Sequence, residues 1–302
     1  MSRAFSPQVD TPLFRTIAEI SGAERHFEGL VRIPLRSPTL PPATTTNHYL
    51  VGSKASVLVD PATPHRASVA TLLTVVAAWQ REVAPVHGLF LTHHHHDHIA
   101  AATTIAERLG LPILAHPATA QLLRGRIDVT THVHEGDRVA HDVAGPWVAL
   151  HTPGHAPGHL VLQGPDGGMV AGDMVAGQGS ILIDPRDGHV GDYIASLRRM
   201  RAAAPPWLAP AHGPLLHHAD AVLEHYISHR IARETAIHEA LTDDFQPADA
   251  LLPHAYGDVS RKIWPLALRS LRAHLVDLQR QGRAESSKGA GWRRSLEPQP
   301  SK

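Results

Sequence analysis

The sequence predicts an α/β fold of two mixed sheets covered by helices, followed by a small helical module. Three observations support this prediction. Short apolar runs alternate with helical patterns as far as residue 216, and histidine or aspartate follows the end of several runs. From Ala219 onward apolar residues recur with helical period, and two strand-like segments follow. We therefore expect two domains, residues 1–216 and 217–302, with roughly the last ten residues disordered.

The elements of the first domain follow from periodicity and from turn residues. Pro34 makes residues 31–35 an expected edge strand, because an edge tolerates proline. Gly52 marks a hairpin turn, and Gly110 should end a helix. In order, we expect a helix near 13–20, strands at 31–35, 47–52 and 55–60, helices at 66–82 and 100–109, a strand at 113–115, a helix at 119–123, strands at 147–151, 160–163, 169–172 and 181–183, and a helix at 193–203.

The second domain is expected to be mostly helical. One helical pattern covers residues 222–241, and Gln246-Pro247 interrupts it. A short helix at 248–254 and a longer one at 263–278 come next, and residues 283–294 contain two short strands around a glycine turn. Three helices and a terminal hairpin are typical of a winged-helix module.

A dense metal-ligand motif follows the apolar run at residues 86–91. Its spacing is H-x-H-x-D-H, which gives His93, His95, Asp97 and His98. A chain with 25 histidines could contain such a cluster by chance. Imidazole and carboxylate are nevertheless ligands that suit zinc, and a strand ending before the motif would spread them over a loop at the sheet edge.

Further potential ligands follow other short apolar runs. His155 lies in the turn Thr-Pro-Gly-His-Ala-Pro-Gly-His, Asp173 ends the run that begins at Met169, and His212 follows the run that begins at Leu208. Each therefore lies in a loop next to a strand candidate, where functional sites gather. Thr92 and Asp60 are candidates for supporting the imidazoles, and His159 is expected to line the site without binding metal.

Taken in this order, the four segments resemble the metallo-β-lactamase superfamily over residues 30–215. The resemblance implies an αββα sandwich with a dinuclear centre, Zn²⁺ being expected at two ions per chain and Fe or Mn being alternatives. It implies that one ion binds His93, His95 and His155, that the other binds Asp97, His98 and His212, and that Asp173 lies between them.

The turn around His155 is similar to the glyoxalase II type. This resemblance implies a hydrolase in which a metal-bridging hydroxide attacks a carbonyl of a small-molecule ester, thioester or lactone. Asp97 would move a proton to the leaving group, and Asp173 would fix the metal spacing. A mononuclear iron sulfur dioxygenase, a β-lactamase and a winged-helix regulator with an inactive metal domain are further alternatives.

The C-terminal module supports a different substrate. Residues 226–230 resemble the β-lactamase-like protein 2 family, some members of which are ribonucleases. From Arg261 onward there are 10 basic and 3 acidic residues, so a metal-dependent ribonuclease or phosphodiesterase is the main alternative, with RNA as the partner. The module could instead cover the active-site mouth or form a homodimer contact.

Composition and charge exclude several other kinds of site and binding partner. Cysteine is absent, which excludes disulfides, thiolate ligands and a cysteine nucleophile. The formal net charge is +0, so no bulk field draws the chain to nucleic acid or membrane. An apolar run long enough for a membrane span is absent, and the first residues do not look like a signal peptide. We expect a cytoplasmic enzyme with no membrane partner.

Overall fold

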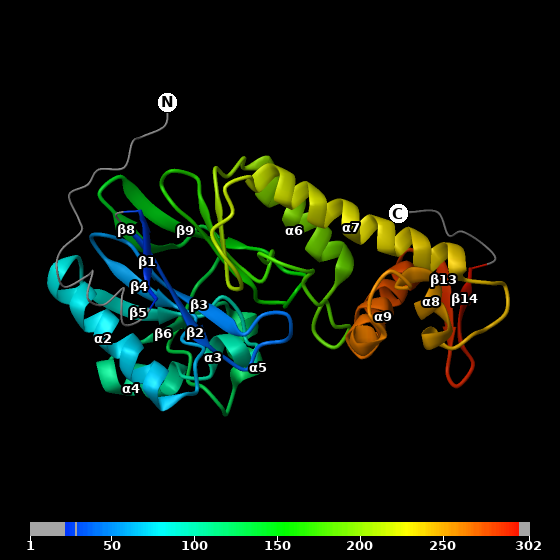
Figure 1. Ribbon diagram of the computed structural model, residues 1–302, viewed down its shortest axis with the longest axis horizontal. Helices are drawn as coiled ribbons and strands as arrows, with labels where there is room; N and C mark the ends of the chain where they lie inside the picture. The colour runs from blue at the N-terminus through cyan, green and yellow to red at the C-terminus, as the bar shows by residue number, and fades with distance from the viewer. Residues whose placement is uncertain (1–21, 28, 296–302) are drawn as a thin grey trace. The chain divides into compact units, whose positions relative to one another are not determined.

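The computed structural model describes residues 22–27 and 29–295 (Figure 1). The helix expected near residues 13–20 and the last residues, 296–302, lie outside the described part. The chain divides into two compact units. The first comprises the chain up to residue 151 together with 158–179 and 206–217, and the second comprises 152–157, 180–205 and the chain from 218 onward.

The first unit contains a mixed sheet of seven strands within the described residues. The first four strands pair antiparallel and the remaining ones pair parallel. In spatial order they are β1 (Glu24–Phe27), β2 (Leu30–Arg36), β3 (Thr45–Val51), β4 (Ser56–Val59), β5 (Val86–Phe90), β6 (Ile113–Ala115) and β7 (Thr131–His132). The predicted hairpin is confirmed, because Leu50 pairs with Leu58.

A second sheet of five strands completes the sandwich in this unit. Its order is β12 (Leu208–Pro210), β11 (Met169–Gly172), β10 (Leu160–Gln163), β9 (Gly145–His151) and β8 (Arg138–Asp142). The β11–β12 pair is parallel and the other pairs are antiparallel, so this sheet is also mixed, as predicted.

Side-chain alternation along the strands explains the layers. In β3, Leu50 enters a core shared with the helices, whereas its neighbour Tyr49 enters a core that includes Trp147 and Leu162 of the second sheet. Both cores are thus filled from one strand with a period of two.

The helices of this unit are α2 (Arg66–Glu82), α3 (His96–Ile99), α4 (Ala102–Leu109) and α5 (Pro117–Leu123), and Figure 1 shows α2 and α4 beside the first sheet.

Three local predictions were wrong. Residues 31–35 are not in an edge strand, since β2 lies between β1 and β3, but β1 pairs only with residues 30–32 and ends before Pro34, where no hydrogen-bond donor is needed on that side. The second half of the ligand motif is a one-turn helix, α3, and not a loop. Residues 181–183 form no strand, and the carbonyls of Ile181 and Leu182 accept hydrogen bonds from side chains instead.

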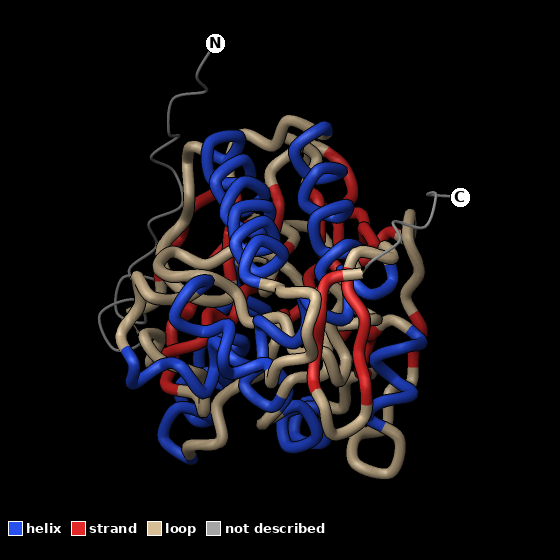
Figure 2. Tube along the Cα trace, turned by 90° about the vertical axis from the view of Figure 1, so that its right-hand side faces the viewer, coloured by secondary structure: helices blue, strands red, loops and turns tan. Residues whose placement is uncertain are grey.

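The second unit is mainly helical. Its elements are α6 (Val190–Ala202), α7 (Ala219–Ala240), η1 (Ala248–Leu251), α8 (Leu252–Ala255), η2 (Arg261–Ile263), α9 (Trp264–Arg280), β13 (Ala284–Ser287) and β14 (Gly291–Arg294). The two strands form the antiparallel hairpin in Figure 2. Ile237, Leu271 and Leu278 are fully buried in a separate core. Among the described residues, no helix is both long and apolar enough to cross a membrane.

Candidate metal centre

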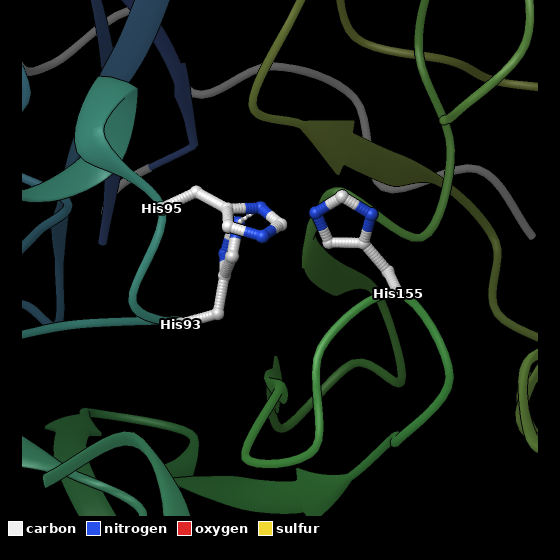
Figure 3. Close-up of side chains that lie close together, drawn as sticks. All are labelled: His93, His95 and His155. Atoms are coloured by element: carbon white, nitrogen blue, oxygen red, sulfur yellow. Dashed lines mark hydrogen bonds between the residues drawn. The ribbon is translucent and has the colours of Figure 1, made fainter. Parts of the chain in front are cut away.

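The ligand motif begins three residues after the end of β5, and the fold brings its side chains together with those of distant segments. His93, His95 and His155 each offer a nitrogen within 4.8 Å of the others, and Figure 3 shows the three rings around one space. Asp97, His98 and His212 form a second group by the same measure. All seven predicted ligand positions occur in groups of this kind, the remaining one being Asp173.

Asp173 connects the groups. It follows β11 directly, and its Oδ1 atom lies 3.5 Å from His98 Nε2 and 3.4 Å from His212 Nε2. It also forms a possible ligand group with His93 and His98. Asp173 thus lies close to a histidine from each of the two predicted ligand sets.

Three of the imidazoles, those of His98, His155 and His212, use Nδ1 for a contact with a residue outside the predicted ligand set. Such contacts fix the tautomer and the ring orientation of metal ligands. His98 Nδ1 lies 2.8 Å from Asp60 Oδ2. His212 Nδ1 lies 3.0 Å from the Thr45 carbonyl, and His155 Nδ1 lies 3.0 Å from the Leu182 carbonyl. The last two partners are backbone carbonyls, which have no signature in a sequence.

His98 provides a test of whether a cation fits. Its Nδ1 atom lies 2.8 Å from Asp60 Oδ2, and its Nε2 atom faces Asp173 at 3.5 Å and Asp97 at 4.0 Å. This buried Nε2 has no hydrogen-bond partner among the described residues. Burial lowers the pKa of His98, but the carboxylates of Asp173, Asp60 and Asp97 outweigh it and raise that pKa well above its usual value. The cluster therefore favours a positive charge at this point, as a metal site must.

Asp60 organises the base of the motif. Its buried carboxylate accepts hydrogen bonds from the Thr92 backbone N–H and hydroxyl, each at 2.7 Å, as well as from His98. Thr92 Oγ1 also lies 3.0 Å from His93 Nδ1. Asp60 has a φ of 48°, a strained conformation of the kind that clusters at functional sites. Both supporting residues suggested by the sequence thus contact ligand candidates.

His159 lies beside the cluster without joining a ligand group of the described residues. Its Nε2 atom accepts the backbone N–H of Asp173 at 3.1 Å, and its ring centroid lies 5.3 Å from that of His93. Gly172 has a φ of 52°, and a Cβ atom there would lie 2.6 Å from the same Nε2 atom. Glycine at this position lets His159 reach the backbone of Asp173.

The role of Asp60 leads to a testable prediction. An Asp60→Asn variant should bind zinc about 10–100-fold more weakly, because an amide cannot accept from His98 and both Thr92 donors with its single oxygen. Chelator competition measures this affinity. Asp166→Asn is the control, since Asp166 also accepts two hydrogen bonds but from Trp207 and Gly168. Equal zinc affinity in the two variants would contradict the assigned role.

The family profile described as metallo-beta-lactamase superfamily matches residues 41–212. The chain belongs to the metallo-beta-lactamase superfamily. A second profile, the beta-lactamase associated winged helix domain, matches residues 248–292. This confirms the predicted winged-helix module, and family and fold together identify a metal-dependent hydrolase.

One relative matches this superfamily member over most of its length, and another matches a shorter part of it. It is 27% identical over 290 residues to "Beta-lactamase-like protein 2 homolog" of Drosophila melanogaster, covering 91% of this chain and 96% of the relative. It is 30% identical to "Lactamase-like protein vrtG" of Penicillium aethiopicum, over 70% and 66% of the two chains. The crystal structure of a beta-lactamase domain protein from Burkholderia ambifaria has a TM-score of 0.77 at 19% identity, over 90% and 93% of the chains, which shows the shared fold.

Proposed function

We propose that this hydrolase is a dinuclear zinc enzyme that acts on a carbonyl centre of a small-molecule ester, thioester or lactone. The position of Asp173 supports this proposal most directly, because a carboxylate near histidines of both sets can serve both ions. In the proposed assignment the first ion binds His93, His95 and His155, the second binds Asp97, His98 and His212, and Asp173 is shared.

The side chains of the chain have separate tasks in this proposal. Two divalent ions bound at such a site activate a water molecule and polarise the substrate oxygen. The Asp97 side chain is 18% exposed, compared with 10% for Asp173 and 0% for His98. Asp97 is therefore the carboxylate best placed to reach a substrate and move a proton to its leaving group, and the more enclosed Asp173 fixes the spacing.

Ion pairing in the second unit favours a small molecule over RNA. Several arginines of the basic C-terminal stretch are paired with carboxylates: Arg269 with Asp184, Arg283 with Glu234 at 2.8 Å, and Arg293 with Glu285 at 2.7 Å. Paired arginines contribute less to phosphate binding, which depends on available positive charge. The zero net charge of the whole chain agrees with this preference.

Metal analysis of the purified protein tests the proposal. We expect about two zinc ions per chain, as in two-metal hydrolases. A strong chelator should abolish hydrolysis in a panel of thioesters, lactones and RNA, and added zinc should restore it. A single iron that remains bound in a His98→Ala/His212→Ala double variant would overturn the dinuclear assignment. Cleavage of RNA without turnover of the carbonyl substrates would overturn the substrate class.

A further inference from the structure

The orientation of His155 depends on the irregular segment at residues 180–189. His155 Nδ1 contacts the Leu182 carbonyl at 3.0 Å, so the plane of the ring follows the position of that peptide. The peptide is not held in a sheet, because residues 181–183 form no strand. Other contacts must therefore keep the Leu182 carbonyl in place.

Arg230 of α7 contacts the preceding peptide. Its guanidinium donates to the Ile181 carbonyl and, at 3.1 Å, to Ser270 Oγ. The same group lies 5.4 Å from the centroid of the Tyr193 ring on α6. The planar guanidinium with several donors can fix a carbonyl, a hydroxyl and a ring at once, which a lysine or an apolar residue cannot do.

The environment of Arg230 makes this arrangement costly. The residue is only 1% exposed, and among the described residues its guanidinium contacts a carbonyl, a hydroxyl and a tyrosine ring but forms no ion pair with a carboxylate. A buried charge without a carboxylate partner is unfavourable, and an apolar side chain would fill the space at lower cost. The cost indicates that the polar contacts of Arg230 serve a purpose other than stability.

The turn that carries His155 is fixed by the same two elements that Arg230 contacts. Ser196 of α6 donates to the Pro153 carbonyl at 2.7 Å, and the His189 N–H donates to the Gly154 carbonyl at 2.7 Å. Arg230 reaches α6 through Tyr193 and the irregular segment through Ile181. Arg230 thus contacts both elements that hold the turn, α6 and the irregular segment.

We propose that Arg230 is a positioning residue for the metal centre: it fixes the Ile181–Leu182 segment so that the Leu182 carbonyl orients the His155 ring. This inference rests on the proposed function, in which His155 is a zinc ligand. Arg230 itself contacts neither metal nor substrate in this role. Helix α7 would then contribute to metal affinity through Arg230.

Matched arginine variants on one helix test the inference. Arg230→Met should weaken binding of one zinc by about tenfold, the lower end of the range for residues that support ligands. Arg233→Met is the control, because Arg233 also donates to a backbone carbonyl, that of Ala255, and lies 4.7 Å from a tyrosine ring, that of Tyr256, without contacting residues 180–189. Its zinc affinity should equal that of the unsubstituted protein. Equal affinities of the two variants would overturn the inference.

A double-variant cycle separates positioning from general stability. If Arg230 acts through His155, Arg230→Met should not lower zinc affinity further in a His155→Ala background. Additive losses would contradict this route. If Arg230→Met does not fold, Arg230→Lys is measured instead, and partial loss of zinc affinity with unchanged secondary structure is expected. Failure of the unsubstituted protein to bind zinc would overturn the proposed function, whereas an unchanged affinity for both ions in every Arg230 variant would overturn only this inference.

Discussion

An Asp173→Asn variant is expected to fold normally, to bind one zinc ion or none in place of the proposed two, and to lose more than 100-fold of its hydrolytic activity, beyond the ~10–100-fold range for residues that only support ligands. The physical reason is charge. The Asp173 Oδ1 atom lies within 3.5 Å of the Nε2 atoms of His98 and His212, and an amide provides no negative charge there. Metal content per chain and kcat on the best carbonyl substrate measure the effect.

Asp142→Asn is a suitable control for that experiment. Asp142 accepts hydrogen bonds from the Ser53 N–H at 2.7 Å and from Trp147 Nε1 at 2.8 Å, and it belongs to no ligand group of the described residues. Its substitution should reduce thermal stability slightly and leave the zinc content unchanged. If Asp173→Asn retained two zinc ions and full activity, the shared-carboxylate assignment would be wrong.

Periodicity and turn residues predicted much of the fold. Tyr49 and Leu50 belong to different cores, and such alternation is visible in the sequence as strand patterning. Gly110 ends α4 in a left-handed conformation, as expected for a helix-stop glycine. The place of Pro34 within the sheet could not be foreseen, since it depends on where β1 stops pairing.

The ligand candidates could also be predicted from the sequence pattern, but the groups that hydrogen-bond to them could not. Histidine and aspartate at the ends of apolar runs are visible side chains, and the family resemblance supplied their grouping. The carbonyls of Thr45 and Leu182 complete the orientation of His212 and His155, but every residue has a carbonyl. The absence of a strand at residues 181–183 is linked to this role, because a carbonyl in a sheet ladder is already bonded.

Gly154→Ala is expected to have the second large effect, because it combines strain with displacement of a ligand candidate. Gly154 is buried at a φ of 130°, and a Cβ atom there would lie 2.2 Å from the Cα and N atoms of Tyr193. The clash is with backbone, so α6 or the turn must move, at a cost of about 2 kcal/mol or more. His155 is the next residue, so we expect zinc affinity to fall together with stability.

Gly110→Ala separates the two consequences. Gly110 also has a positive φ, 64°, but a Cβ atom there meets nothing within 4 Å. It should cost about 1 kcal/mol from backbone strain alone. Thermal unfolding and chelator competition on both variants then give stability and zinc affinity separately. If zinc affinity were unchanged in Gly154→Ala as in Gly110→Ala, the packing of the turn on α6 would not control His155. If zinc affinity fell only in Gly154→Ala, the close approach of Gly154 to Tyr193 would be what holds His155 in position to bind metal together with His93 and His95.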